Sequence, residues 1–202
     1  MGERDPFVAV LAGGRGRRLG GSKASVKLAG RPLISYPLKA ARDAGIEAIV
    51  VAKEASLLPE LVEPVLLEPD QPSHPLCGIA RALSFARERS PRASIVLVAC
   101  DMPFVTSRLL AWLAGLEGPA VAVLGGRIEA TLGRYISSDL PILREALGAE
   151  CPLREAVARL SPRQIVGERE LSRFGDPARL CFNVNRPEDL QKAEEWLSRP
   201  SS

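Results

Sequence analysis

The sequence predicts an α/β protein built around a mostly parallel central sheet. Short apolar, β-branched runs alternate with stretches of helical periodicity through the first half of the 202-residue chain, and this alternation implies βαβ crossovers. Residues 94–99, Ser-Ile-Val-Leu-Val-Ala, are apolar on both faces, as in a parallel strand covered by helices on two sides. No linker or internal repeat interrupts the chain, so we expect one domain over residues 1–202.

The first predicted strand, residues 7–12, ends in a glycine-rich cationic loop. Glycines let backbone N–H groups approach phosphate oxygens closely, and the basic side chains supply countercharge, so the loop suits a phosphorylated ligand. A solvated basic turn is the alternative. The spacing does not match G-x-G-x-x-G or a Walker P-loop. The loop residues concerned are Gly13, Gly14, Arg15, Arg17, Arg18 and Lys23.

The remaining elements follow from apolar periodicity and from glycine and proline signals. In the first half we expect a helix over 32–44, strands over 47–52 and 64–67, a helix over 76–89 and a strand over 94–99. In the second half we expect helices over 107–116, 140–147, 152–160 and 187–197, with strands over 120–124, 132–136 and 180–184. The strand pairing of this half stays open.

Ligands of open α/β sheets bind beyond the carboxyl ends of the strands. That edge would bring together the loop 13–23, Asp70 and Asp101. Glycines and cations beside carboxylates indicate a nucleotide with a divalent metal, and Asp101 suits Mg²⁺, which takes one or two carboxylates. The alternative for Asp101 is a helix cap or turn. Asp70, taken alone, reads as a turn residue.

Two further groups of polar or flexible residues are candidates. Asn183 and Asn185 would share one face of the strand 180–184, where they bind a ligand or cap the strand end. Gly78, near a predicted helix start, would let backbone N–H groups meet a base or phosphate. His74, in the proline-rich loop before it, reads as structural.

Composition restricts the function classes. The 27 basic and 24 acidic residues give a net charge of +3, and 4% aromatic content disfavours a base-stacking surface, so we expect no nucleic-acid partner. Four cysteines without a C-x-x-C pair, and a single histidine, favour buried reduced thiols over a zinc site. A charged start and the absence of a long apolar run predict a cytoplasmic protein without a membrane span.

Together, these motifs resemble the molybdenum cofactor guanylyltransferase (MobA-like) family, within the nucleotidyltransferase superfamily. The resemblance extends over nearly the whole chain. It is carried by Leu11-Ala12-Gly13-Gly14 with Arg18 and Lys23, Asp70, Pro75-Leu76-Cys77-Gly78-Ile79, Cys100-Asp101-Met102-Pro103, and the run from Phe182 to Leu190 that contains Asn183-Val184-Asn185.

The resemblance implies a Rossmann-like three-layer nucleotidyltransferase fold, with a GTP-binding half at about 1–105 and an acceptor-binding half at about 106–198. It implies GTP as donor, molybdenum-bearing molybdopterin as acceptor, Mg²⁺ as cofactor, and the guanine dinucleotide cofactor and pyrophosphate as products. It leaves open transient contact with proteins that deliver molybdopterin.

Site roles follow from the resemblance and from the loop residues together. The nucleotide-binding set is Leu11, Ala12, Gly13, Gly14, Arg15, Lys23, Asp70, Gly78 and Asp101. The catalytic set is Arg18, Lys23 and Asp101. Asp101 and Asn185 are the metal candidates, and Asn183 and Asn185 are the acceptor candidates.

Three positions depart from the family pattern. His74 replaces a glycine, Lys53 an asparagine and Arg186 a threonine. The first two lie near the expected nucleotide pocket and so bear on base selectivity. Adenosylcobinamide-phosphate guanylyltransferase and molybdopterin cytidylyltransferase are the enzyme alternatives, which the Pro-Leu-x-Gly-Ile segment disfavours. A nucleotide- or RNA-binding adaptor is the non-enzyme alternative.

Overall fold

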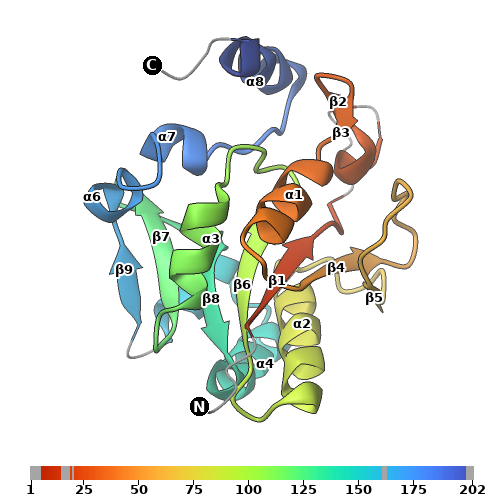
Figure 1. Ribbon diagram of the computed structural model, residues 1–202. Helices are drawn as coiled ribbons and strands as arrows, with labels where there is room; N and C mark the ends of the chain where they lie inside the picture. The colour runs from red at the N-terminus through yellow and green to blue at the C-terminus, as the bar shows by residue number, and fades with distance from the viewer. Residues whose placement is uncertain (1–5, 15–18, 20, 161–162, 199–202) are drawn as a thin grey trace.

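A seven-stranded sheet forms the centre of the molecule, in the strand order β5-β4-β1-β6-β8-β7-β9 (Figure 1). This computed structural model describes residues 6–14, 19, 21–160 and 163–198. Only β8 runs against its neighbours in this sheet, so the predicted, mostly parallel α/β fold is confirmed. The strands are β1 (Pro6–Leu11), β4 (Ala48–Lys53), β5 (Val65–Glu68), β6 (Ser94–Ala99), β7 (Ala120–Leu124), β8 (Arg127–Ile136) and β9 (Gln164–Val166).

Helices cover both faces of the sheet and make three layers (Figure 1). One face carries α1 (Ser35–Asp43), α3 (Ser107–Ala114), α6 (Glu168–Leu171) and α7 (Pro177–Leu180). The other carries α2 (Pro75–Arg89), α4 (Leu140–Gly148) and α5 (Leu153–Ala158). The described residues also include the short 3-10 helices η2 (Lys23–Ser25) and η3 (Ser137–Asp139). Within the described ranges, no helix combines the length and the apolar character needed to cross a membrane.

The strand β6 shows why the sheet is buried. Ile95 and Leu97 pack into the core on the α2 side, whereas Val96 and Val98 pack on the α1 and α3 side, and all four are fully buried. Burying one such side chain stabilises the fold by roughly 1.5–3 kcal/mol. The apolar run predicted to be a two-sided parallel strand is therefore the middle of the core.

Helix boundaries follow local chemistry. The helix predicted from residue 32 begins at Ser35, because Arg31–Pro32 forms β3, which pairs with β2 (Lys27–Leu28) in a small antiparallel hairpin. The helix α2 begins at Pro75, since His74 is its N-cap: the Leu76 N–H donates to His74 Nδ1 at 3.1 Å. The structural role predicted for His74 is confirmed.

The predicted strand over 180–184 is wrong. The Asp176 carboxylate accepts a hydrogen bond from the Ala178 N–H at 2.8 Å and caps the short helix α7, which ends at Leu180. A loop follows, and Val184 N–H donates to the Asp101 carbonyl at 2.9 Å. The apolar run thus docks on the loop after β6 instead of joining a ladder. The edge strand β9, only three residues long, was not predicted.

Besides the apolar clusters on the two faces of the sheet, a third one lies beyond the carboxyl ends of the strands. It joins Leu28 and Leu33 near the hairpin to Val184 and to Ala193 of α8 (Pro187–Ser198). Figure 1 shows α8 and the β2–β3 hairpin side by side beyond the carboxyl ends of the strands. This packing fixes Asn185, late in the chain, beside Lys23.

Candidate functional site

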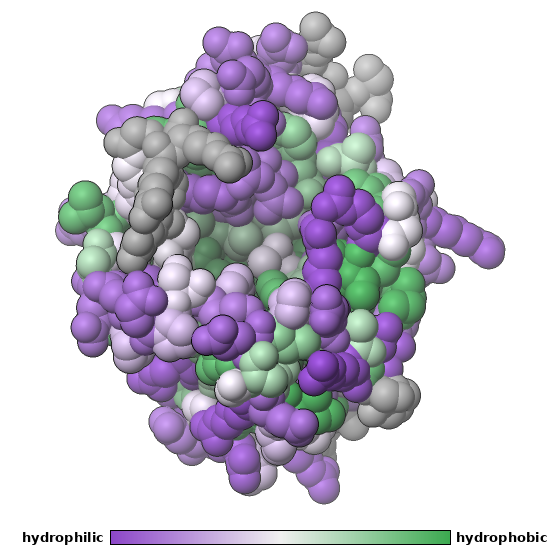
Figure 2. Space-filling model, turned by 180° about the vertical axis from the view of Figure 1, so that it is seen from behind, coloured by the Kyte–Doolittle hydropathy of each residue, from purple (hydrophilic) through white to green (hydrophobic). Residues whose placement is uncertain are grey.

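A cavity of about 600 Å³ opens at the carboxyl edge of the sheet. The last residues of four neighbouring parallel strands line it: Leu11 of β1, Lys53 of β4, Glu68 of β5 and Ala99 of β6. Figure 2, seen from behind, shows a hollow with pale and green residues at its floor and purple residues at its rim. The cavity therefore lies at the edge where open α/β sheets bind their ligands.

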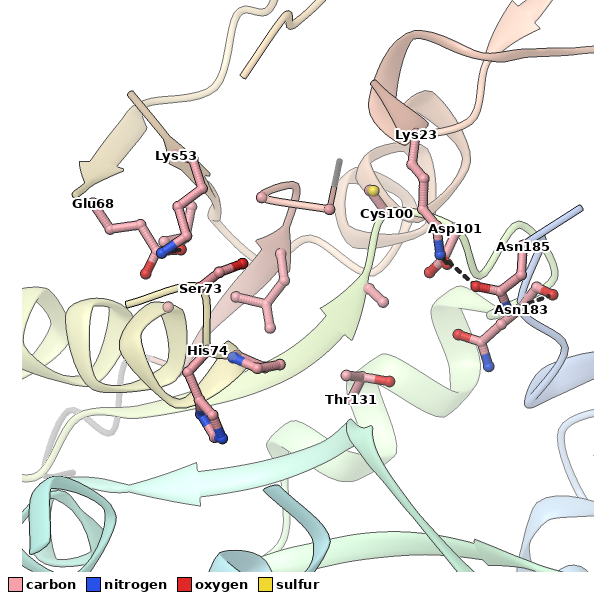
Figure 3. Close-up of a pocket in the computed structure, with 17 residues that line it drawn as sticks. Lys23, Lys53, Glu68, Ser73, His74, Cys100, Asp101, Thr131, Asn183 and Asn185 are labelled. Carbon is pink, nitrogen blue, oxygen red and sulfur yellow. Dashed lines mark hydrogen bonds and ion pairs between the residues drawn. The ribbon is translucent and has the colours of Figure 1, made fainter. Parts of the chain in front are cut away.

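Lys23 bridges two side chains at one end of this cavity. Its Nζ lies 2.6 Å from Asp101 Oδ2 and 2.5 Å from Asn185 Oδ1 (Figure 3). The three residues come from η2, from the turn after β6 and from the loop before α8. The Lys23 side chain is only 20% exposed and that of Asp101 8%, so Lys23 does not belong to a fully solvated basic turn, the alternative that its sequence context left open.

The same two oxygens fit a divalent cation. Asp101 Oδ2 and Asn185 Oδ1 already converge on one positive centre, the Lys23 ammonium. Carboxylate and amide oxygens are hard donors of the kind that Mg²⁺ takes, and Mg²⁺ needs only one or two from the protein when phosphates supply others. The described residues hold no cluster of three His, Cys, Asp or Glu, so these oxygens suit Mg²⁺ better than a metal that needs a full protein cage.

A buried ion pair lies at the other end. Lys53 and Glu68 are cross-strand partners of β4 and β5, with Nζ and Oε1 3.1 Å apart. Lys53 Nζ also donates to the carbonyls of Pro69 at 2.8 Å and Pro72 at 3.1 Å. Lys53 therefore holds the loop that leads into α2 against the strand ends.

One oxygen of Glu68 has no partner among the described residues. Its Oε2 is buried without a hydrogen bond, and the side chain is 7% exposed. Burial raises the pKa of the Glu68 carboxyl, although Lys53 acts in the opposite direction. An unsatisfied buried acceptor is costly, and an N–H donor from a ligand in the cavity would satisfy it.

Two glycines make room at this end. A Cβ on Gly13 would lie 3.2 Å from Lys53 Cγ and 3.3 Å from Glu68 Oε1. A Cβ on Gly78 would lie 2.8 Å from Leu11 Cδ2. Gly13 thus leaves room beside the buried Lys53–Glu68 pair, and Gly78 lets α2 approach β1 closely.

Most predicted site residues meet in the cavity. Those that line it are Leu11, Gly13, Gly14, Lys23, Gly78, Asp101, Asn183 and Asn185. Ala12 is buried behind it, with its N–H bonded to the Val51 carbonyl at 2.8 Å. Arg15 and Arg18, like Arg17, lie outside the described residues.

Asp70 is not among the residues that line the cavity. Its Oδ1 accepts a hydrogen bond from the Ala55 N–H at 3.2 Å, which matches the turn role that its sequence context indicates. Besides Asp101, the acid that lines the cavity is Glu68, which we did not single out. The sequence did contain a signal for Glu68: it is the last residue of a strand, and Asp101 likewise stands just after the apolar strand β6.

Asn183 and Asn185 reach the cavity from a loop rather than from a strand. Asn183 Nδ2 donates to the Cys181 carbonyl at 3.0 Å, and Asn185 Nδ2 donates to the Asn183 carbonyl at 3.3 Å. The Asp189 carboxylate accepts from the Asn185 N–H at 2.9 Å. These bonds orient the amide oxygen of Asn185 toward Lys23.

The cysteines are all free, as predicted, and three are buried. Cys100 lines the cavity, and burial raises the pKa of its thiol. A neutral thiol is a poor nucleophile. Cys100 is therefore part of the cavity wall.

Residues 8–178 match the MobA-like NTP transferase domain. The chain belongs to this family.

Its similarity to other members of the MobA-like family extends over almost the full length. A molybdenum cofactor guanylyltransferase of Cereibacter sphaeroides is 32% identical over 198 residues, covering 96% of this chain and 97% of the relative. One of Rhizobium rhizogenes is 34% identical, covering 97% and 93%.

Solved structures show the same architecture. The molybdopterin-guanine dinucleotide biosynthesis protein A of Archaeoglobus fulgidus superposes with a TM-score of 0.75 at 26% identity, covering 95% of this chain and 98% of that one. The 2-C-methyl-D-erythritol 4-phosphate cytidylyltransferase of Thermus thermophilus has a TM-score of 0.65 at 22% identity, covering 94% and 97%. The latter indicates a shared fold only.

Proposed function

We propose that this protein transfers GMP from GTP to molybdenum-bearing molybdopterin, with the guanine dinucleotide cofactor and pyrophosphate as products. The observation that carries the proposal is the bridge from Lys23 to Asp101 and Asn185, which places one cation and two hard oxygens together at the carboxyl edge of the sheet. The donor and acceptor are those implied by the names of the near full-length relatives.

Lys23 serves the phosphate end of the reaction. A phosphate oxygen of molybdopterin attacks the α-phosphorus of GTP, and the bond to the β-phosphate bridging oxygen breaks. Both reactants are anions, so the protein must screen their repulsion and hold them in line. The attacking phosphate is largely ionised near neutral pH, with a second pKa of about 6, so no general base is required. Arg15 and Arg18 stay predictions for the same end.

Asp101 and Asn185 are the residues that would hold Mg²⁺. When bound, the ion supplies charge neutralisation to phosphate oxygens. Asn183 and Asn185, on the loop from the second half of the chain, line the cavity together with Lys23, which supports a role for them in binding the acceptor phosphate.

Glu68 serves the base end. Guanine presents two adjacent donors, the N1–H and the 2-amino group, which one carboxylate accepts together. Glu68 Oε2 is buried and unpartnered among the described residues, while Lys53 fixes Oε1. We infer that Glu68 reads the guanine edge, with Lys53 as its positioning residue.

The reaction is tested with purified protein, Mg²⁺, molybdate-loaded molybdopterin and each of the four nucleoside triphosphates. We expect release of pyrophosphate that depends on the acceptor and is fastest with GTP. Faster release with CTP would replace the proposal with cytidylyl transfer, and binding of GTP without any release would favour an adaptor.

The role of Glu68 is tested with inosine triphosphate, which lacks the 2-amino group. A hydrogen bond to a charged group contributes about 1.5–3 kcal/mol, so Glu68→Gln should lower kcat/KM for GTP by about ten- to a hundredfold. The preference for GTP over inosine triphosphate should shrink as well. Glu54→Gln, which changes an exposed acid next to β4, is the control. An unchanged preference in Glu68→Gln would exclude this role.

A further inference from the structure

A second cavity adjoins the first. It has a volume of about 320 Å³ and is lined by Glu129, Ala130, Thr131, Pro152, Leu153 and Arg154. We propose that it binds the pterin ring of the acceptor, a bicyclic 2-amino-4-oxopteridine. This inference rests on the proposed function, because that function makes the acceptor a pterin.

Thr131 connects the two cavities, since it lines both. In Figure 3 it lies across the cavity from the Lys23–Asp101 pair, on the side of Asn183. Because β8 runs antiparallel to β6 with Leu132 opposite Val98, Thr131 lies at the carboxyl end of β6 and residues 129–130 continue past it. A ligand whose phosphate lies near Lys23 can therefore extend over Thr131 toward Glu129.

The backbone of β8 is irregular at this place. Val121 of β7 pairs with Gly133, whereas the next residue, Ala122, pairs with Glu129. Residues 130–132 therefore have no partner on β7 in the described register. Bulges of this kind redirect side chains and are frequent next to active sites. The irregularity coincides with the residues shared by the two cavities.

The polar groups of the second cavity complement the edge of a pterin. Arg154 Nε donates to the Ile128 carbonyl at 2.9 Å, which fixes the guanidinium. Its Nη2 lies 3.9 Å from Glu129 Oε1, farther than a hydrogen bond. The carboxylate is thus open to the 2-amino group and the neighbouring ring N–H of a pterin, and the guanidinium to its 4-oxo oxygen. Ala130, Pro152 and Leu153 supply apolar contacts to the ring.

The surroundings of Glu129 agree with this role. Its side chain is 19% exposed, and burial raises the pKa of the carboxyl, with Arg154 and then Arg127 opposing the change. A partly desolvated carboxylate gains more from two N–H donors than a solvated one. Guanine carries the same donor pair, so the two acids, Glu68 and Glu129, would divide the guanine and the pterin between them.

Binding of unsubstituted pterin, followed by its fluorescence, tests the site without reference to turnover. We expect quenching by the wild-type protein that persists with saturating α,β-methylene-GTP and Mg²⁺. Glu129→Gln and Arg154→Met should each raise the Kd for pterin at least tenfold, while Glu68→Gln should leave it unchanged. Glu117→Gln, at an exposed acid outside both cavities, is the matched control, and melting temperatures verify folding.

Three results would overturn the inference: no quenching by the wild type at millimolar pterin, displacement of pterin by the GTP analogue, or wild-type affinity in both Glu129→Gln and Arg154→Met. Failure of the proposed function looks different, because pterin would then bind while no nucleoside triphosphate released pyrophosphate. In turnover assays we expect Glu129→Gln to raise the KM for molybdopterin with little change in the KM for GTP.

Discussion

Asp101 is buried, and its carboxylate accepts a hydrogen bond from the Lys23 ammonium. Asp101→Asn keeps the shape and one acceptor oxygen, but Mg²⁺ prefers a charged oxygen to a neutral amide. We expect turnover to drop by orders of magnitude and half-saturating Mg²⁺ to rise, while the melting temperature without ligands changes little. Steady-state pyrophosphate release across a Mg²⁺ titration measures this.

If Asp101 is only a capping or turn residue, the expected result is different. A capping aspartate replaced by asparagine keeps most of its capping ability, so activity and stability would both stay near wild type. Turnover close to wild type at low Mg²⁺ in Asp101→Asn would therefore exclude the metal assignment.

Asp139 carries a pH effect on stability far from the cavity. It is buried, accepts a hydrogen bond from the Ile136 N–H at 2.9 Å, and burial raises its pKa from 3.8 to about 6. Between these values the native state binds more protons than the unfolded state, so the stability contributed by this group is lost as the pH rises through 6. We expect Asp139→Asn to gain stability relative to wild type between pH 4 and pH 7.

Urea unfolding at several pH values measures this effect as the difference between variant and wild type. Asp43→Asn changes an exposed acid paired with Lys39 and is the control. A difference for Asp139→Asn that stays constant across the pH range would contradict the assignment.

At the scale of elements, the packing of β7 against β8 depends on Gly133. A Cβ there would overlap the Ala120 carbonyl oxygen and lie 3.2 Å from Val121 Cα, both backbone atoms that cannot rotate away. Overpacking of this kind costs typically 1–3 kcal/mol. We expect Gly133→Ala to lower the free energy of unfolding by about this amount, as measured by urea denaturation.

Gly118→Ala is the matched control, because no atom lies within 4 Å of its added Cβ. It should change stability far less. Equal changes in the free energy of unfolding from Gly133→Ala and Gly118→Ala would show that β7 and β8 accommodate a Cβ at position 133 without a loss of stability.

The elements also explain which sequence predictions hold. The strands β1, β4 and β6 are apolar runs buried on both faces, so their own composition identifies them. The run at 180–184 has the same composition, but the Asp176-Pro177 pair starts a helix just before it and a backbone bond from Val184 to Asp101 replaces a sheet ladder. Local composition indicates burial there, and it cannot indicate what covers the segment.

At the scale of the whole molecule, GTP should stabilise the fold, because the cavity is assembled from segments that are separate in the unfolded chain. A ligand at a hundred times its Kd adds about 2.7 kcal/mol, and each kcal/mol raises the melting temperature by about 2–4 °C in a chain of this size. We expect GTP with Mg²⁺ to raise the melting temperature more than CTP, ATP or UTP. A larger shift with CTP would contradict guanine selectivity.

The sequence by itself determined the α/β class, the edge of the sheet where the cavity opens and the acid after β6, because these depend on local patterns that are the same in any fold of this type. Only the tertiary structure decided that Lys23 contacts Asn185, 162 positions away, and that Glu68 rather than Asp70 faces the cavity. Side chains from distant segments meet because the β2–β3 hairpin and α8 share one apolar cluster. Cross-strand register places Glu68 opposite Lys53, and no local pattern specifies register between strands separated by a loop.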